Sequence, residues 1–118
     1  MAPDADTSLR LPAVVKTTLE AFVSGVRAQL GGRVKEIRLF GSHARGEATD
    51  ESDVDVLVLL DSADRRDDIA ITNLAADLIW QLDGVVISPM VMSVGEFDAW
   101  KASERRTPLE IDRDGIPL

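Results

Sequence analysis

The sequence contains no cysteine among its 118 residues. This absence excludes disulfide bonds, zinc sites built from thiolates and cysteine nucleophiles, and it fits a protein that works in a reducing compartment. Long apolar runs are also missing, because no segment approaches the roughly 20 apolar residues of a membrane-spanning helix. The first twelve residues lack the apolar core of a signal peptide. We therefore expect a cytoplasmic protein that is not inserted in a membrane.

Basic residues are scarce, with 13 lysines and arginines against 21 acidic residues and a net charge of −8. That balance disfavours a broad surface that neutralises the phosphates of DNA or RNA, so nucleic acid is not the first choice of partner. A small nucleotide is still compatible, since one arginine, a few backbone amides and a divalent cation hold a triphosphate locally. The length predicts a single domain over residues 1–118.

The spacing of apolar residues predicts the order of the elements. Repeats of three and four predict helices over residues 11–30, 65–82, 93–100 and 107–115. Gly31 and Gly84 are the expected terminators of the first two helices. The pairs Ser93 with Glu96 and Thr107 with Glu110 predict capping boxes at the start of the last two. Alternating or continuous apolar runs predict strands over residues 34–40, 54–60 and 85–92. The continuous run of the second strand indicates cover on both faces, and Pro89 places the third strand at an edge or bulge. The expected fold class is α/β (α+β), a small mixed β-sheet packed with helices.

The polar segment between the first two strands carries the chemistry. Gly41 permits close approach of the backbone, Ser42 adds a hydroxyl, and outward amides at such a turn receive phosphate oxygens. Arg45 offers a planar cation with several donors for the same anion. Asp53 and Asp55 lie two apart at a strand start, so their carboxylates share one face and can share a divalent cation. We expect a site for phosphate and Mg²⁺ or Mn²⁺.

The pattern of Gly41-Ser42, about ten further residues and Asp53-Val-Asp55 resembles the nucleotidyltransferase superfamily, and in particular its short members, the minimal nucleotidyltransferases. The segment 41–46, the segment Ser52-Asp-Val-Asp55 and the tail 107–118 are also similar to those proteins. The resemblance implies a nucleotidyltransferase fold with Asp53 and Asp55 as catalytic metal ligands. It adds Ser52 to Gly41, Ser42 and Arg45 as nucleotide-binding residues.

The resemblance also implies an activity and a partner. It predicts transfer of a nucleoside monophosphate, AMP from ATP, to a hydroxyl group. Small members of the family act as antitoxins beside a helical HEPN toxin, so an HEPN-type protein is the expected partner and acceptor, and a homodimer is compatible with the sequence. Without a second lobe in a chain this short, the partner would supply the missing wall of the site.

One departure from the family separates two hypotheses. The family's third carboxylate belongs on the strand predicted at 85–92, where the equivalent positions are Val86 and Ser88. Asp83, Glu47 or Glu51 could replace it. With a replacement the protein is an enzyme that depends on magnesium. Without one it is a binding module that neutralises or scaffolds a helical partner by contact.

Other residues in and around the motif have structural explanations beside functional ones. His43, the only histidine, lies inside the motif, but we weigh a catalytic role below a structural one. Trp80, Phe97 and Trp100 occupy apolar helical positions, which favours packing in the core, or else at an interface, over stacking on a base. Arg45 could pair with Glu47 or Asp50 at the surface instead of binding an anion.

Overall fold

The computed structural model describes residues 11–49, 51–82 and 85–118. Its sheet has the strand order β3-β2-β1-β4. Strands β1 (Val34–Phe40) and β2 (Val54–Leu60) occupy the predicted positions and run antiparallel. Strand β3 (Ile87–Ser93) starts two residues later than predicted, and it lies parallel to β2 at an edge of the sheet, as Pro89 indicated.

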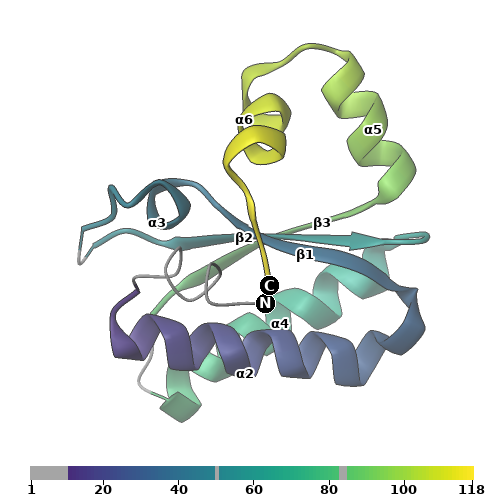
Figure 1. The fold of residues 1–118 in the computed structure, drawn as a ribbon. Coiled ribbons are helices and arrows are strands. Elements are labelled where there is room, and N and C mark those ends of the chain that lie inside the picture. The colour runs from purple at the N-terminus through teal and green to yellow at the C-terminus, as the bar shows by residue number, and fades with distance from the viewer. Residues whose placement is uncertain (1–10, 50, 83–84) are drawn as a thin grey trace, which may run out of the picture.

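Helices cover both faces of the sheet (Figure 1). Helices α2 (Ala13–Leu30) and α4 (Arg65–Leu82) lie side by side on one face. Helices α5 (Val94–Ala102) and α6 (Arg106–Asp114) cover the other face, near the end where β3 leads into α5. The short helix α3 (Ser42–Arg45) forms a single turn in the segment between β1 and β2.

Alternation along β2 divides the core into two clusters, as expected for a strand that is covered on both faces. Val54, Val56 and Val58 are fully buried and pack in the cluster that contains α2 and α4 side chains such as Phe22 and Ile71. Leu57 and Leu59 belong to the second cluster, with Phe97 of α5 and Ile111 of α6. The odd-numbered residues of β2, Asp55 included, therefore face the side of α5 and α6.

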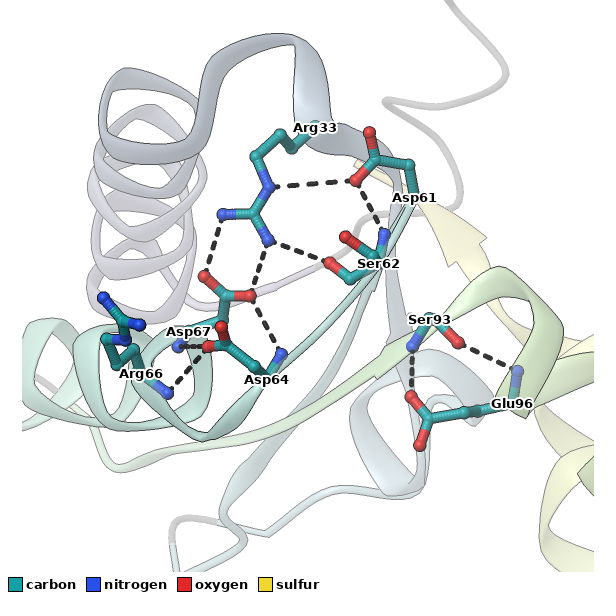
Figure 2. Close-up of polar contacts among 8 residues, drawn as sticks. All are labelled: Arg33, Asp61, Ser62, Asp64, Arg66, Asp67, Ser93 and Glu96. Atoms are coloured by element: carbon teal, nitrogen blue, oxygen red, sulfur yellow. Dashed lines mark hydrogen bonds and ion pairs between the residues drawn. The ribbon is translucent and has the colours of Figure 1, made fainter.

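The helix ends confirm some predicted signals and correct others. Gly31, with a φ of 54°, ends α2 and begins the 3-10 turn η1 (Gly31–Arg33). At α5, Ser93 and Glu96 form the expected capping box, in which each side chain accepts the other's backbone N–H (Figure 2). The capping box predicted at Thr107 is wrong, because α6 begins one residue earlier, after Arg105, without a side-chain cap.

Two further differences concern the chain ends of elements. The strand β4 (Ile116–Pro117) was not predicted, and it pairs antiparallel with β1 at Arg38 and Leu39. Two residues are too few to show an alternating pattern, so tertiary pairing alone reveals this strand. Gly84, the expected terminator of α4, lies outside the described residues. Within the described ranges, no helix is both long and apolar enough to cross a membrane.

An ion-pair cluster joins η1 to the start of α4 (Figure 2). The Arg33 guanidinium donates to both carboxylate oxygens of Asp67, at 2.9 and 2.6 Å, and to the Ser62 carbonyl at 2.9 Å. Asp67 Oδ2 also accepts the Asp64 backbone N–H at 3.0 Å. The Asp67 side chain is buried beneath Arg33. The charge-assisted bonds hold the pKa of the Asp67 carboxyl below its usual range.

Candidate active site

The turn that the sequence predicts to bind phosphate lies at Gly41, where β1 ends and α3 begins. Gly41 has a φ of 78°, a left-handed conformation that favours glycine. Its carbonyl accepts the backbone N–H groups of Ala44 and Arg45 at 3.1 and 3.2 Å, and the Ser42 carbonyl accepts the Glu47 N–H at 2.9 Å. The turn is thus closed by its own backbone, with Ser42 as the first residue of α3.

The two predicted metal ligands lie at the entrance of β2, across from this turn. Asp55 pairs with Phe40 of β1 on one side and with Ser88 of β3 on the other. A Cβ placed on Gly41 would overlap the Asp55 carboxylate, so the turn and this acid are in direct contact. Asp53 precedes β2 by one residue and is exposed. Spacing by two directs both carboxylates to the face of α5 and α6.

Electrostatics at this edge favour a bound cation. Burial raises the pKa of the Asp55 carboxyl, and the nearby charge of Asp53 raises it further. His43 and Arg45 act in the opposite direction without reversing the shift. A divalent cation would neutralise both carboxylates, and carboxylate oxygens are ligands that Mg²⁺ and Mn²⁺ accept. The two carboxylates therefore fit such an ion, and Asp53 and Asp55 are the residues that would act as its ligands.

Arg45 and Ser52, the remaining predicted nucleotide-binding residues, are engaged within the chain. Arg45 Nε donates to Glu47 Oε1 at 2.9 Å, which is the surface pair weighed above, and Arg45 is exposed. Glu110 and Asp114 of α6 also act on its charge. The Ser52 hydroxyl accepts the Thr49 backbone N–H at 2.9 Å.

Of the two positions where the family's third carboxylate was expected, Val86 and Ser88, it is Ser88 that lies beside Asp55 on the neighbouring strand. The parallel register pairs Asp55 with Ser88, whereas Val86 precedes β3 and its carbonyl accepts the Val54 N–H at 2.9 Å. Within residues 11–49, 51–82 and 85–118, no three histidines or acidic residues gather as a metal site. Asp83 lies outside those residues.

The structure corrects the prediction for Trp80 and shows the contact made by His43. Trp80 is 87% exposed on α4, so the prediction that it packs in the core is wrong, while Phe97 is buried and meets Trp100 edge to face. His43 is buried at 8% exposure, and its Nε2 lies 3.3 Å from the Ser52 carbonyl oxygen. Its place inside the motif was the one signal of this contact in the sequence.

A cavity of about 480 Å³ lies apart from the two acids. Its walls include Val14 and Val15 of α2, and His43, Ser52 and Val85. Asp53 and Asp55 are not among its lining residues, since they face the opposite side of the sheet. The candidate site is therefore the edge where Gly41 at the end of β1 meets Asp55 at the start of β2, and not this cavity.

Comparison with known proteins places the site in a family context. Residues 19–105 match the sequence profile of the family described as Nucleotidyltransferase domain. The chain is 46% identical over 43 residues to a protein of Methanocaldococcus jannaschii that is named for a proposed protein adenylyltransferase activity. That match covers 36% of this chain and 43% of the relative, so the chain spans less than half the length of that relative.

Solved structures share the architecture. One described as a minimal nucleotidyltransferase has 26% identity and a TM-score of 0.52, with 87% of this chain and 91% of that chain covered. Another, a toxin-antitoxin crystallised with AMP-PNP, has 24% identity and a TM-score of 0.50, covering 83% and 70% of the two chains. The expected nucleotidyltransferase fold is confirmed. Because the family profile runs from α2 into the segment after α5 and takes in both halves of the candidate site, the chain belongs to the nucleotidyltransferase domain family.

Proposed function

We propose that this nucleotidyltransferase transfers AMP from ATP to a hydroxyl on a partner protein, and that it needs Mg²⁺ or Mn²⁺ to do so. The observation that carries the proposal is the direct contact between Gly41 and Asp55, which joins a phosphate-binding turn to a pair of carboxylates. The named activity of the archaeal relative supports adenylyl transfer. The AMP-PNP bound by a protein of the same fold supports a nucleoside triphosphate as the substrate.

Each group has a stated task in this proposal. The amides of the turn at Gly41 and Ser42 bind the triphosphate, and Arg45 leaves Glu47 to pair with a phosphate oxygen. Asp53 and Asp55 would hold the cation, which would supply positive charge to stabilise the transferred phosphoryl group. The acceptor oxygen forms a bond to the α-phosphorus, the bond from that phosphorus to the bridging oxygen breaks, and pyrophosphate leaves.

The partner we propose is a helical HEPN-type toxin, with this chain as its antitoxin. The resemblance of segments 41–46 and 107–118 to small antitoxin members motivates that choice, and the toxin-antitoxin of the same fold supports it. A hydroxyl group of the HEPN-type toxin would accept the AMP. Such a partner would approach the edge of the sheet where α3 and the entrance of β2 carry the predicted site residues.

A second function is favoured by a specific observation. Ser88, not an acid, stands beside Asp55, and the described residues hold no group of three metal-ligating side chains. A protein with a weakened metal site would instead bind and neutralise its partner without turnover. In that case the fold and the partner surface remain, and nucleotide transfer is lost.

Labelled ATP separates the two functions. The chain is incubated with Mg²⁺, ATP labelled at the α-phosphate, and the protein encoded by the adjacent gene. Label on the partner, abolished in Asp53→Asn, is the result expected for the enzyme. A tight complex by size-exclusion chromatography with no label on the partner would support the binding module and overturn the transferase proposal.

A further inference from the structure

His43 is a buried polar residue for which the proposed chemistry has no use. It is the second residue of α3, and only 8% of it is exposed. Its Nε2 lies 3.3 Å from the Ser52 carbonyl oxygen. Because a carbonyl oxygen only accepts, the ring nitrogen is the donor, at a distance near the long end of the range for such bonds. The contact satisfies a polar group that burial would otherwise leave without a partner.

The two residues of this contact belong to separate parts of the site. His43 follows Gly41 and Ser42 directly, whereas Ser52 immediately precedes Asp53. The contact therefore links the phosphate-binding turn to the first metal ligand. Nine positions of sequence separate its ends.

The backbone bonds around His43 are local to one end or the other of the segment. Near its start, the Glu47 N–H donates to the Ser42 carbonyl at 2.9 Å. Near its end, the Ser52 N–H donates to the Thr49 carbonyl at 3.0 Å, and Thr49 returns its own N–H to the Ser52 hydroxyl. Each set closes one turn. Of these contacts, the one between His43 and Ser52 joins the two turns to each other.

The surroundings of His43 and Ser52 relate the contact to the rest of the fold. His43 is buried, and it lines the cavity together with Val15 of α2, a residue of the main core cluster. Beyond Ser52, the Val54 N–H donates to the Val86 carbonyl at 2.9 Å, which attaches the entrance of β2 to the segment before β3. Asp53 thus lies between a sheet hydrogen bond on one side and the carbonyl held by His43 on the other.

We propose that His43 is a positioning residue, which sets the distance between the turn at Gly41 and the carboxylate of Asp53 through the Ser52 carbonyl. The inference rests on the proposed function, because its consequence is the affinity for a metal–nucleotide complex. The turn and the acid must engage one ligand together, and small misplacements of such groups weaken binding and catalysis strongly.

Two substitutions at position 43 separate the hydrogen bond from the packing of the ring. His43→Phe keeps a ring of similar size in the buried position but has no nitrogen donor. His43→Gln loses the ring but keeps a side-chain N–H at about the reach of Nε2. A positioning role through the hydrogen bond predicts that Gln preserves the site and Phe impairs it. A packing role predicts the opposite order.

Two measurements report on the variants. Calorimetric titration with Mn²⁺ and ATP gives the affinity, and we expect a loss of about tenfold in His43→Phe and near wild-type affinity in His43→Gln. Hydrogen–deuterium exchange of a peptide spanning residues 47–54, measured without nucleotide, should be faster in His43→Phe alone. Thermal unfolding of both variants shows whether each is folded.

The exchange measurement keeps this inference separate from the proposed function. If the wild type binds no Mn²⁺ and ATP, the proposed function fails, and the exchange rates still test the contact between His43 and Ser52. Wild-type affinity and wild-type exchange in His43→Phe would overturn the positioning role. A folded Gln variant that is impaired more than the Phe variant would assign His43 to packing. If the Gln variant does not fold, the Phe variant decides alone.

Discussion

Gly41 and Asp55 face each other so closely that a side chain at position 41 would overlap the Asp55 carboxylate. From the sequence, the missing side chain of Gly41 predicts room for a phosphate beside the backbone. The structure adds a second reason, because the carboxylate of Asp55 on β2 occupies the space that a side chain at position 41 would need. Gly41 is therefore constrained three ways: by its φ of 78°, by the neighbouring carboxylate and by the proposed ligand.

Gly46 provides a matched control for the first prediction. It has a φ of 73°, and a Cβ there would meet no atom within 4 Å. Gly46→Ala should therefore cost only the backbone strain, about 1 kcal/mol, and retain ATP binding. Gly41→Ala should lose more stability and at least about tenfold in ATP affinity, because Asp55 must move. Urea unfolding and calorimetry measure both, and equal effects of the two variants would contradict the contact.

The acids of the site should destabilise the metal-free protein. Burial and the charge of Asp53 raise the pKa of Asp55 in the fold, so the charged carboxylate is less stable there than in the unfolded chain. At pH 7, Asp55→Asn should raise the midpoint of thermal unfolding by about 3 °C while abolishing Mn²⁺-dependent ATP binding. The stabilisation should shrink as the pH falls toward the unfolded pKa of about 3.9, where wild-type Asp55 becomes neutral too. A variant less stable than wild type at every pH would refute this account.

Substitutions of Arg45 and of its partner Glu47 should change the ATP affinity in opposite directions. Arg45 Nε is paired with Glu47 at 2.9 Å, and the pair is exposed. A phosphate must compete with that carboxylate for the guanidinium. Glu47→Gln should therefore raise ATP affinity about two- to fivefold, whereas Arg45→Gln should lower it. Calorimetry at low ionic strength gives the largest difference, and a weaker-binding Glu47→Gln would indicate that Glu47 itself contributes to the site.

The sequence predicted most of the fold because the elements near the site carry strong local signals. The continuous apolar run of β2 identified a strand with cover on both faces, and its two core clusters bear this out. The capping-box pair Ser93 and Glu96 correctly predicted the start of α5. At α6 the same signal failed, because the helix begins at Arg106, before Thr107. The spacing of local residue types does not fix the first residue of a helix that has no side-chain cap.

Relationships between distant segments were beyond the reach of the sequence. The strand β4 exists only through its pairing with β1, and the exposure of Trp80 depends on which face of α4 meets the sheet. Motif spacing brought Gly41 and Asp55 to the same region, but only the register of β1 with β2 places them in contact. The same holds for Ser88, whose position beside Asp55 follows from a parallel pairing.

The ion pair of Arg33 and Asp67 should affect stability and leave the site untouched. Asp67→Asn removes the charge that accepts two guanidinium N–H groups, so the unfolding midpoint at pH 7 should fall by about 4 °C with unchanged ATP affinity. The pKa of Asp67 is lowered in the fold, so its contribution is complete above the unfolded pKa of about 3.9 and disappears as the pH falls through the folded value. Thermal melts from pH 7 to pH 2 measure this, and a difference that persists at the lowest pH would exclude an electrostatic cause.

Ser88 provides the decisive test of whether the metal site is incomplete. Its register beside Asp55 means that an acid at position 88 would share the face of Asp53 and Asp55. Ser88→Asp should raise the affinity for Mn²⁺ about tenfold or more, since a third carboxylate adds a hard ligand and a charge. Without metal the same variant should be less stable than wild type, because three like charges then face one another.

A charge-matched control separates ligation from a general gain of negative charge. Asn73 is exposed on α4, on the far side of the sheet from the acids, so Asn73→Asp adds the same charge without adding a ligand. Only Ser88→Asp should bind Mn²⁺ more tightly. If label transfer from ATP to the partner also becomes faster in this variant, the wild type is limited by its two-carboxylate site. If Ser88→Asp and Asn73→Asp change Mn²⁺ affinity equally, position 88 does not contribute to a metal site. The rate of AMP transfer by the wild type is then not limited by a missing third acid at this position.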